Sequence, residues 1–345
     1  MKRRLRIVSG AAVLAVIALA SAVAFAQGQP ASGTQAPYSP PRTPLGDPDL
    51  QGIWPGTDMV GVPFERPEQF GTRLFLTDAE LKEREQQASK QQELDVLDFD
   101  LQKPPAEIVA LGDVGGVTSP PPHWLERGVP SRQSSLIVQP ANGRMPAMTP
   151  EGTARQKTAG GTYVKQTGFN NASELGPYDR CISRGVVGSM MPVVYNNGNE
   201  IVQSPGFVAF RNEMIHEVRI IPLGERQPLP VDMKSYMGSS RGHFEGNTLV
   251  VRTTNLNGKT GMQGNGMMLI PSDSIVIEER FTPVSANVLQ YEVTINDPNT
   301  WTAPWKVSFP LKREQDYQMF EYACHEGNYA MRNTLSGSRA DEGKK

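Results

Sequence analysis

The pattern of apolar and polar positions changes near residue 200, where short runs of β-forming residues begin to recur. In residues 291–295 (YEVTI) apolar and polar side chains alternate, which is typical of a strand with one buried face. Turn residues separate the runs at roughly the spacing seen in antiparallel sandwiches and barrels. The predicted strands are residues 200–203, 207–210, 214–221, 242–244, 248–254, 274–281, 288–295, 305–311 and 320–323, with a tight hairpin turn at 245–247.

Before residue 160 the sequence predicts two helices and one strand. Thr77 followed by Glu80 forms a capping box, which predicts a helix from residue 78 to about residue 95. Its apolar residues are sparse, so we expect it on the surface. Thr149 followed by Pro150 predicts a second, short helix, and residues 135–138 predict a strand.

These elements predict a mainly β fold. No helix of crossover length separates the strands after residue 200, which argues against an α/β topology. We therefore expect one antiparallel domain over residues 46–345, barrel-like or sandwich-like. An irregular and partly helical segment (46–160) would wrap a β core (161–340), with one or two helices at the periphery.

The N-terminus predicts export. Residues 1–26 combine four basic side chains, an apolar run and an A-x-A cleavage site, the pattern of a signal peptide. Residues 27–45 are rich in Pro, Ser, Gly and Gln and predict a disordered lead-in. No other segment is apolar for long enough to cross a membrane. The mature chain is therefore expected in the periplasm or outside the cell.

Composition narrows the classes of partner. Of 34 basic and 36 acidic side chains, the signal peptide removes four basic ones, which leaves a net charge of −6. An acidic chain without a basic stripe is not expected to bind nucleic acid. With 33 Gly and 29 Pro the chain is rich in turn formers.

The two cysteines, Cys181 and Cys324, are predicted to form a disulfide, because export leads to an oxidising compartment. A pair of buried free thiols is the alternative.

Familiar catalytic patterns are incomplete. Residues 238–242 match G-x-S-x-G, but a hairpin rather than a helix follows. His216-Glu217 and His325-Glu326 lack the second histidine of H-E-x-x-H, and no nucleotide-binding glycine pattern occurs. We therefore expect no cofactor and assign no metal ligands.

Dispersed polar residues remain as candidates for chemistry. A strand over 214–221 would place His216 on one face with Met214 and Val218, either as a core histidine or in a cavity. The candidate acid–base residues are His216, His325, Glu245 and Glu326. The candidate ligand-binding residues are Arg241, His243, Trp54, Tyr291 and Trp305. His123 is expected to lie in a loop.

Several segments resemble one exported bacterial family, abundant in soil bacteria, whose members are uncharacterised. They are residues 46–54 (GDPDLQGIW), 179–181 (DRC), 238–251, 297–301 (DPNTW) and 321–329 (EYACHEGNY). The resemblance implies secretion and a compact β-rich domain, and it implies no reaction. In addition, residues 52–54 (GIW) are similar to the G-x-W of lipocalin-like barrels.

Three functions fit these observations. The first is the binding of a small, largely apolar molecule in a barrel or cleft, since such cavities are common ligand sites. The second is a cofactor-free acid–base enzyme, a hydratase, isomerase or hydrolase, that uses His and Glu in the same cavity. The third is a structural or envelope-interaction protein. The oligomeric state is left open.

The predicted disulfide can be tested by mass. Alkylation of the denatured mature protein without reductant should label neither cysteine, because both sulfurs are bonded to each other. After reduction it should label both. Two labelled thiols without reductant would show that the bridge does not form.

Overall fold

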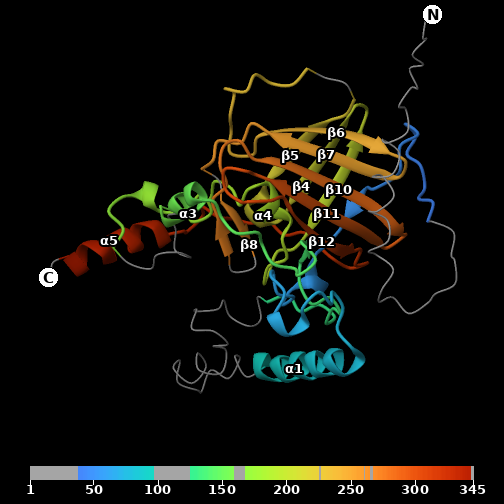
Figure 1. The fold of residues 1–345 in the computed structure, drawn as a ribbon, viewed down its shortest axis with the longest axis horizontal. Helices are drawn as coiled ribbons and strands as arrows, with labels where there is room; N and C mark the ends of the chain where they lie inside the picture. The colour runs from blue at the N-terminus through green and yellow to red at the C-terminus, as the bar shows by residue number, and fades with distance from the viewer. Residues whose placement is uncertain are drawn as a thin grey trace, which may run out of the picture. The chain divides into compact units, whose positions relative to one another are not determined.

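Two antiparallel β-sheets form the centre of the fold (Figure 1). The first has the strand order β1-β3-β4-β5, and the second has the order β2-β12-β11-β10-β7-β6. The first sheet consists of β1 (Gly52–Ile53), β3 (Asn199–Ser204), β4 (Phe207–Asn212) and β5 (Val218–Pro222). The second consists of β2 (Ile137–Gln139), β6 (Ser239–Glu245), β7 (Thr248–Thr254), β10 (Val276–Ser285), β11 (Val288–Asn296) and β12 (Trp305–Lys312). A separate hairpin pairs β8 (Met262–Gly264) with β9 (Met267–Leu269).

This computed structural model describes residues 38–96, 125–158, 168–224, 227–259, 261–264 and 267–342. The predicted signal peptide, residues 27–37 of the predicted lead-in and His123 lie outside these ranges. The described residues belong to one compact unit. Among the described residues, no helix combines the length and apolarity that a membrane crossing requires.

The strand pattern read from the sequence agrees with a mainly β fold of the sandwich type. Along β10 and β11 buried and partly exposed residues alternate, as expected for sheets with one face in the core. The turn at Gly246 joins β6 to β7 in the predicted hairpin, and Glu245 pairs with Thr248 beside it. The barrel alternative is wrong, because each sheet keeps two edge strands and the sheets do not close on each other.

Two predicted strands need correction. Residues 214–216 form a 3₁₀ turn (η6) in place of the start of a strand, because Ile215 and His216 adopt positive φ angles, so β5 begins only at Val218. Residues 320–323 form no strand, although the sequence there is aromatic. The strand predicted over 135–138 overlaps β2, and β1 and β2 are edge strands that the segment 46–160 contributes to the two sheets.

The described residues contain four α-helices, two more than expected. The predicted ones are α1 (Asp78–Val96) and α3 (Pro150–Lys157). Thr77 and Glu80 form the capping box of α1, since the Glu80 carboxylate accepts from the Thr77 N–H at 2.7 Å. The additional helices are α4 (Val186–Met190) and α5 (Ala330–Glu342). The start of the described chain, expected within the lead-in, contacts the β6–β7 turn through Arg42 and Asn247.

The sheets meet through aromatic rings and one buried ion pair. Phe210 of β4 lies 4.6 Å from Phe281 of β10, measured between ring centroids, and the ring contacts continue through Tyr291 to Phe309. Beside these rings, Arg219 of β5 forms a bidentate ion pair with Glu279 of β10, and both side chains are buried. The Tyr291 hydroxyl donates to the same carboxylate at 3.1 Å. This cluster connects the two layers.

Replacing Arg219 by methionine should lower the free energy of unfolding by about 3–5 kcal/mol, because it leaves the Glu279 carboxylate buried without its cation. Urea denaturation of the purified variant measures this loss. Arg211→Met is the matched control, since Arg211 of the first sheet forms an exposed pair with Glu200, worth about 0–1 kcal/mol. Equal losses in the two variants would contradict a special role for the buried pair.

Candidate functional site

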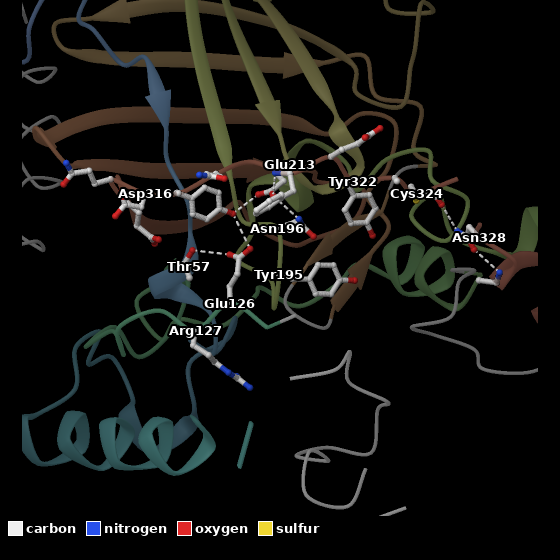
Figure 2. Close-up of a pocket in the computed structure, with 18 residues that line it drawn as sticks. Thr57, Glu126, Arg127, Tyr195, Asn196, Glu213, Asp316, Tyr322, Cys324 and Asn328 are labelled. Atoms are coloured by element: carbon white, nitrogen blue, oxygen red, sulfur yellow. Dashed lines mark hydrogen bonds between the residues drawn. The ribbon is translucent and has the colours of Figure 1, made fainter. Parts of the chain in front are cut away.

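An open cleft of about 1670 Å³ lies where the ends of β3 and β4 meet the segment that follows β12. Figure 2 shows the residues that line it. The described lining residues are Thr57, Glu126, Arg127, Tyr195, Asn196, Glu213, Glu314, Gln315, Asp316, Tyr317, Gln318, Phe320, Glu321, Tyr322, Ala323, Cys324, Asn328 and Ala330.

Most of one wall comes from residues 313–329, which join β12 to α5 without a helix or strand. We call this segment the strap. It supplies eleven of the eighteen lining residues. Because the strap has no sheet partner, side chains from other segments must hold it in place.

The buried Glu213 carboxylate is the first fastening of the strap. It accepts from the Tyr317 hydroxyl at 2.7 Å and from the Phe320 N–H at 2.9 Å. Asn196 and the Gly198 N–H donate to the same carboxylate at 3.0 and 3.1 Å. A side chain at position 198 would meet Glu213 and Tyr317 at less than 3 Å, so this approach requires glycine. Four donors leave Glu213 little capacity for a ligand.

Glu126 lies beside this fastening. It accepts from the side-chain amide of Asn197 at 2.8 Å and from the Thr57 hydroxyl at 3.3 Å, and its other oxygen lies 3.3 Å from the Tyr317 hydroxyl. Burial, the charge of Glu126 and the hydrogen bond to Glu213 all raise the pKa of Tyr317. The phenol therefore stays protonated as a donor between two carboxylates. This arrangement is structural, because each carboxylate is already hydrogen-bonded within the protein.

The predicted disulfide provides the second fastening. Cys181 and Cys324 are bonded, with their Cα atoms 5.8 Å apart, which confirms the pairing. The closed loop spans 143 residues, and such a bridge is worth about 2–5 kcal/mol to a fold. Its direct effect here is to hold the end of the strap against the segment that contains Tyr178.

His216 provides a third fastening. Its Nδ1 lies 2.9 Å from the carbonyl oxygen of Tyr322, so this nitrogen donates to the strap backbone. The Tyr322 hydroxyl lies 3.3 Å from that of Tyr178, which is in turn 3.5 Å from the hydroxyl of Tyr195. Burial and the neighbouring phenols raise the pKa of Tyr178. The wall next to the disulfide is thus lined by phenol rings, and Figure 2 shows those of Tyr195 and Tyr322.

The cleft is electrostatically negative. Five of the described lining residues are acidic and one is basic, and Figure 2 shows this residue, Arg127, pointing away from Glu126 and Glu213. Burial and the charges of Asp58 and Glu126 raise the pKa of Glu314 above its ordinary 4.5, whereas Lys312 lowers it. In the described part of the chain, the carboxylates of Asp316 and Glu321 have no hydrogen bond or ion pair. The cleft therefore offers uncompensated negative charge beside aromatic rings.

None of the four predicted acid–base residues lines this cleft. His216 binds the strap from behind, and His325 and Glu326 are exposed at the end of the strap. Glu245 lies on β6, where it is exposed and paired with His243 at 3.1 Å and with Arg280 at 2.7 Å. Arg280 and His243 lower the pKa of Glu245, so it remains a carboxylate.

The predicted ligand-binding residues lie elsewhere. Arg241 is on β6, where it donates to the carbonyl of Ser240 at 2.9 Å. Trp54, Tyr291 and Trp305 are buried in the core, since large aromatic side chains on inward-facing positions fill the space between sheets. The Trp54 indole donates to the Leu50 carbonyl at 2.8 Å, and Arg313 lies over its ring.

Sequence reasoning did not identify Glu126, Glu213 or Tyr317. No local pattern marks them, because they meet only when segments about 70 to 190 positions apart come together. A weak signal is present in the acidic and aromatic composition of 314–322 (EQDYQMFEY), whose last residues fall in the predicted strand over 320–323. Among the described residues, no group of three or more His, Cys, Asp or Glu side chains is arranged to hold a metal ion.

Comparisons with protein-family models, curated proteins and solved structures found no match for this chain.

Glu314 gives the folded state a testable pH dependence. Its raised pKa means that ionised Glu314 destabilises the fold, and the cost appears as the pH rises from 4.5 through the raised value. Glu314→Gln should therefore increase the free energy of unfolding at about pH 7, and the gain should vanish near pH 3.5, where glutamate is protonated in both states. Denaturation at both pH values measures this. The exposed Glu85→Gln on α1 is the control, and the same pH-dependent gain there would contradict the assignment.

Proposed function

We propose that this protein is an exported binding protein whose cleft holds a positively charged organic ligand. The observation that carries the proposal is the pairing of uncompensated carboxylates with aromatic rings in one cleft. Asp316 and Glu321 supply charge, and Tyr195, Phe320 and Tyr322 supply apolar surface. A purely apolar ligand would leave these carboxylates facing it without solvation, at a cost.

A cation suits both parts of the cleft. An ammonium group gains Coulomb attraction from nearby carboxylates, and about 0.5–2 kcal/mol more when it lies over an aromatic face. Burial, and then the charges of Asp58 and Glu126, raise the pKa of Glu314, and a bound cation would offset these negative charges. We therefore expect affinity to fall as the pH drops through the raised pKa of Glu314.

Acid–base catalysis is less well supported than binding. Glu126 and Glu213 both lie next to the Tyr317 hydroxyl, but the protein's own donors occupy these two carboxylates. No predicted histidine joins them in the cleft lining. An acid–base pair needs a proton-transfer group with free access to the substrate.

Export is part of the proposal. The disulfide between Cys181 and Cys324 is compatible with an oxidising compartment. The basic and apolar segment at residues 1–26 supports a signal peptide. The site of action would then be the periplasm or the extracellular space.

If the proposal is correct, the cleft selects its ligands by positive charge and not only by the shape of the apolar group. Calorimetric titration at about pH 7.5 and low salt should show binding of benzylammonium but not of benzyl alcohol, which has the same ring and no charge. Asp316→Asn combined with Glu321→Gln should weaken benzylammonium binding about three- to tenfold, and added salt should weaken it in the unmodified protein.

The matched control removes two exposed carboxylates elsewhere, by Glu85→Gln with Asp232→Asn. This variant has the same net charge as the cleft variant but keeps the carboxylates of the cleft. It should therefore bind benzylammonium as the unmodified protein does. Equal binding of both ring compounds, or equal weakening by the two double variants, would overturn the proposal.

A further inference from the structure

The cleft is large for a site that holds one small cation. Pockets for small ligands typically measure about 300–1000 Å³ and enclose most of the ligand surface. This cleft measures about 1670 Å³ and is open to solvent. A single ammonium compound would fill only part of it.

Acidic side chains are spread along the strap. Glu314, Asp316 and Glu321 lie at separate positions on this one segment and all line the cleft. The only described basic lining residue, Arg127, comes from another segment and points away from Glu126 and Glu213 in Figure 2. Charges distributed in this way complement an extended ligand with several positive groups.

Exposed apolar side chains occur in the segments that line the cleft. Phe320 lines it, and Tyr329 lies between the lining residues Asn328 and Ala330. Val194 precedes the lining residue Tyr195, and Val129 follows shortly after the lining residues Glu126 and Arg127. The Glu126 N–H donates to the Val194 carbonyl at 2.8 Å. These four side chains are between 41% and 69% exposed. Exposed large apolar side chains next to a concave surface are typical of an interaction site, and we call these four residues the apolar rim.

We propose that the natural ligand is an extended polypeptide segment in which Lys or Arg residues alternate with apolar ones. The basic side chains would pair with Glu314, Asp316 and Glu321, and the apolar side chains would cover Phe320, Tyr329, Val194 and Val129. An extended chain directs successive side chains to opposite sides, so one segment presents its basic and its apolar side chains to different groups of cleft residues. This inference rests on the proposed cation-binding function and specifies its ligand class.

Fluorescence anisotropy with labelled, end-capped octapeptides tests the inference on the full-length mature protein with its disulfide intact. A peptide of four Lys-Leu repeats should bind. Peptides of four Glu-Leu repeats and four Lys-Ser repeats should bind at least about tenfold more weakly, because each lacks one of the two complementary features. Butylammonium, which carries one charge and one short apolar chain, should compete only at far higher concentration.

Two variants locate the contact. Phe320→Ser with Tyr329→Ser should weaken Lys-Leu binding about tenfold or more, since each change removes a large apolar contact. Val231→Ser with Met233→Ser alters two exposed apolar residues of another loop and should leave binding unchanged. Circular dichroism and unfolding of both variants check that each one folds.

The outcomes separate the two proposals. If benzylammonium or butylammonium binds as tightly as the Lys-Leu octapeptide, the polypeptide inference is overturned and cation binding stands. If Lys-Ser binds as tightly as Lys-Leu, or if the control variant weakens binding as much as the rim variant, the apolar rim plays no part and the inference is also overturned. If neither peptides nor small cations bind, both proposals fail.

Discussion

The buried ion pair between Arg219 and Glu279 is the interaction on which the rest of this structure depends. It connects a strand of the four-stranded sheet to a strand of the six-stranded sheet, and the Tyr291 hydroxyl completes it. Taking two charges out of water is costly, so the pair is favourable only in a well-fixed geometry. The centroid of the Phe210 ring lies 5.3 Å from the Arg219 guanidinium carbon, and the same ring packs on Phe281. The ion pair therefore forms only when these rings are packed correctly, and the rings pack correctly only when the ion pair is in place.

The ion pair also fixes the position of the groups that form the cleft. The strand β4 ends at Asn212, directly before Glu213, and β5 begins just after His216, so fixing these two strands also fixes the groups that hold the strap. Glu213 and His216 then bind the strap at Tyr317, Phe320 and Tyr322, and the disulfide binds it at Cys324. A wall without secondary structure is positioned in this way by side chains from regular elements, and its own carboxylates remain available to a ligand.

The cleft thus contains carboxylates in two different roles. Glu126 and Glu213 are surrounded by donors and act as parts of the framework. Asp316 and Glu321 have no such donors among the described residues and face the cleft from the strap. Residue type alone does not distinguish these roles, because the difference lies in how many hydrogen bonds the fold supplies to each group.

The sequence by itself determined the β-rich class, most strands after residue 200, the β6–β7 hairpin, the starts of α1 and α3 and the cysteine pairing. Each of these depends on short-range patterns, such as alternation, turn residues and caps, or on there being only two cysteines. Only the tertiary structure decided that the sheets form a sandwich rather than a barrel, that Tyr291 and Trp305 belong to the core, and that His216 fastens the strap. These outcomes depend on contacts between distant segments. An aromatic or acidic residue has the same identity in the sequence whether it packs in the core, holds a loop or contacts a ligand. These three roles differ only in the neighbouring residues that the fold brings to it.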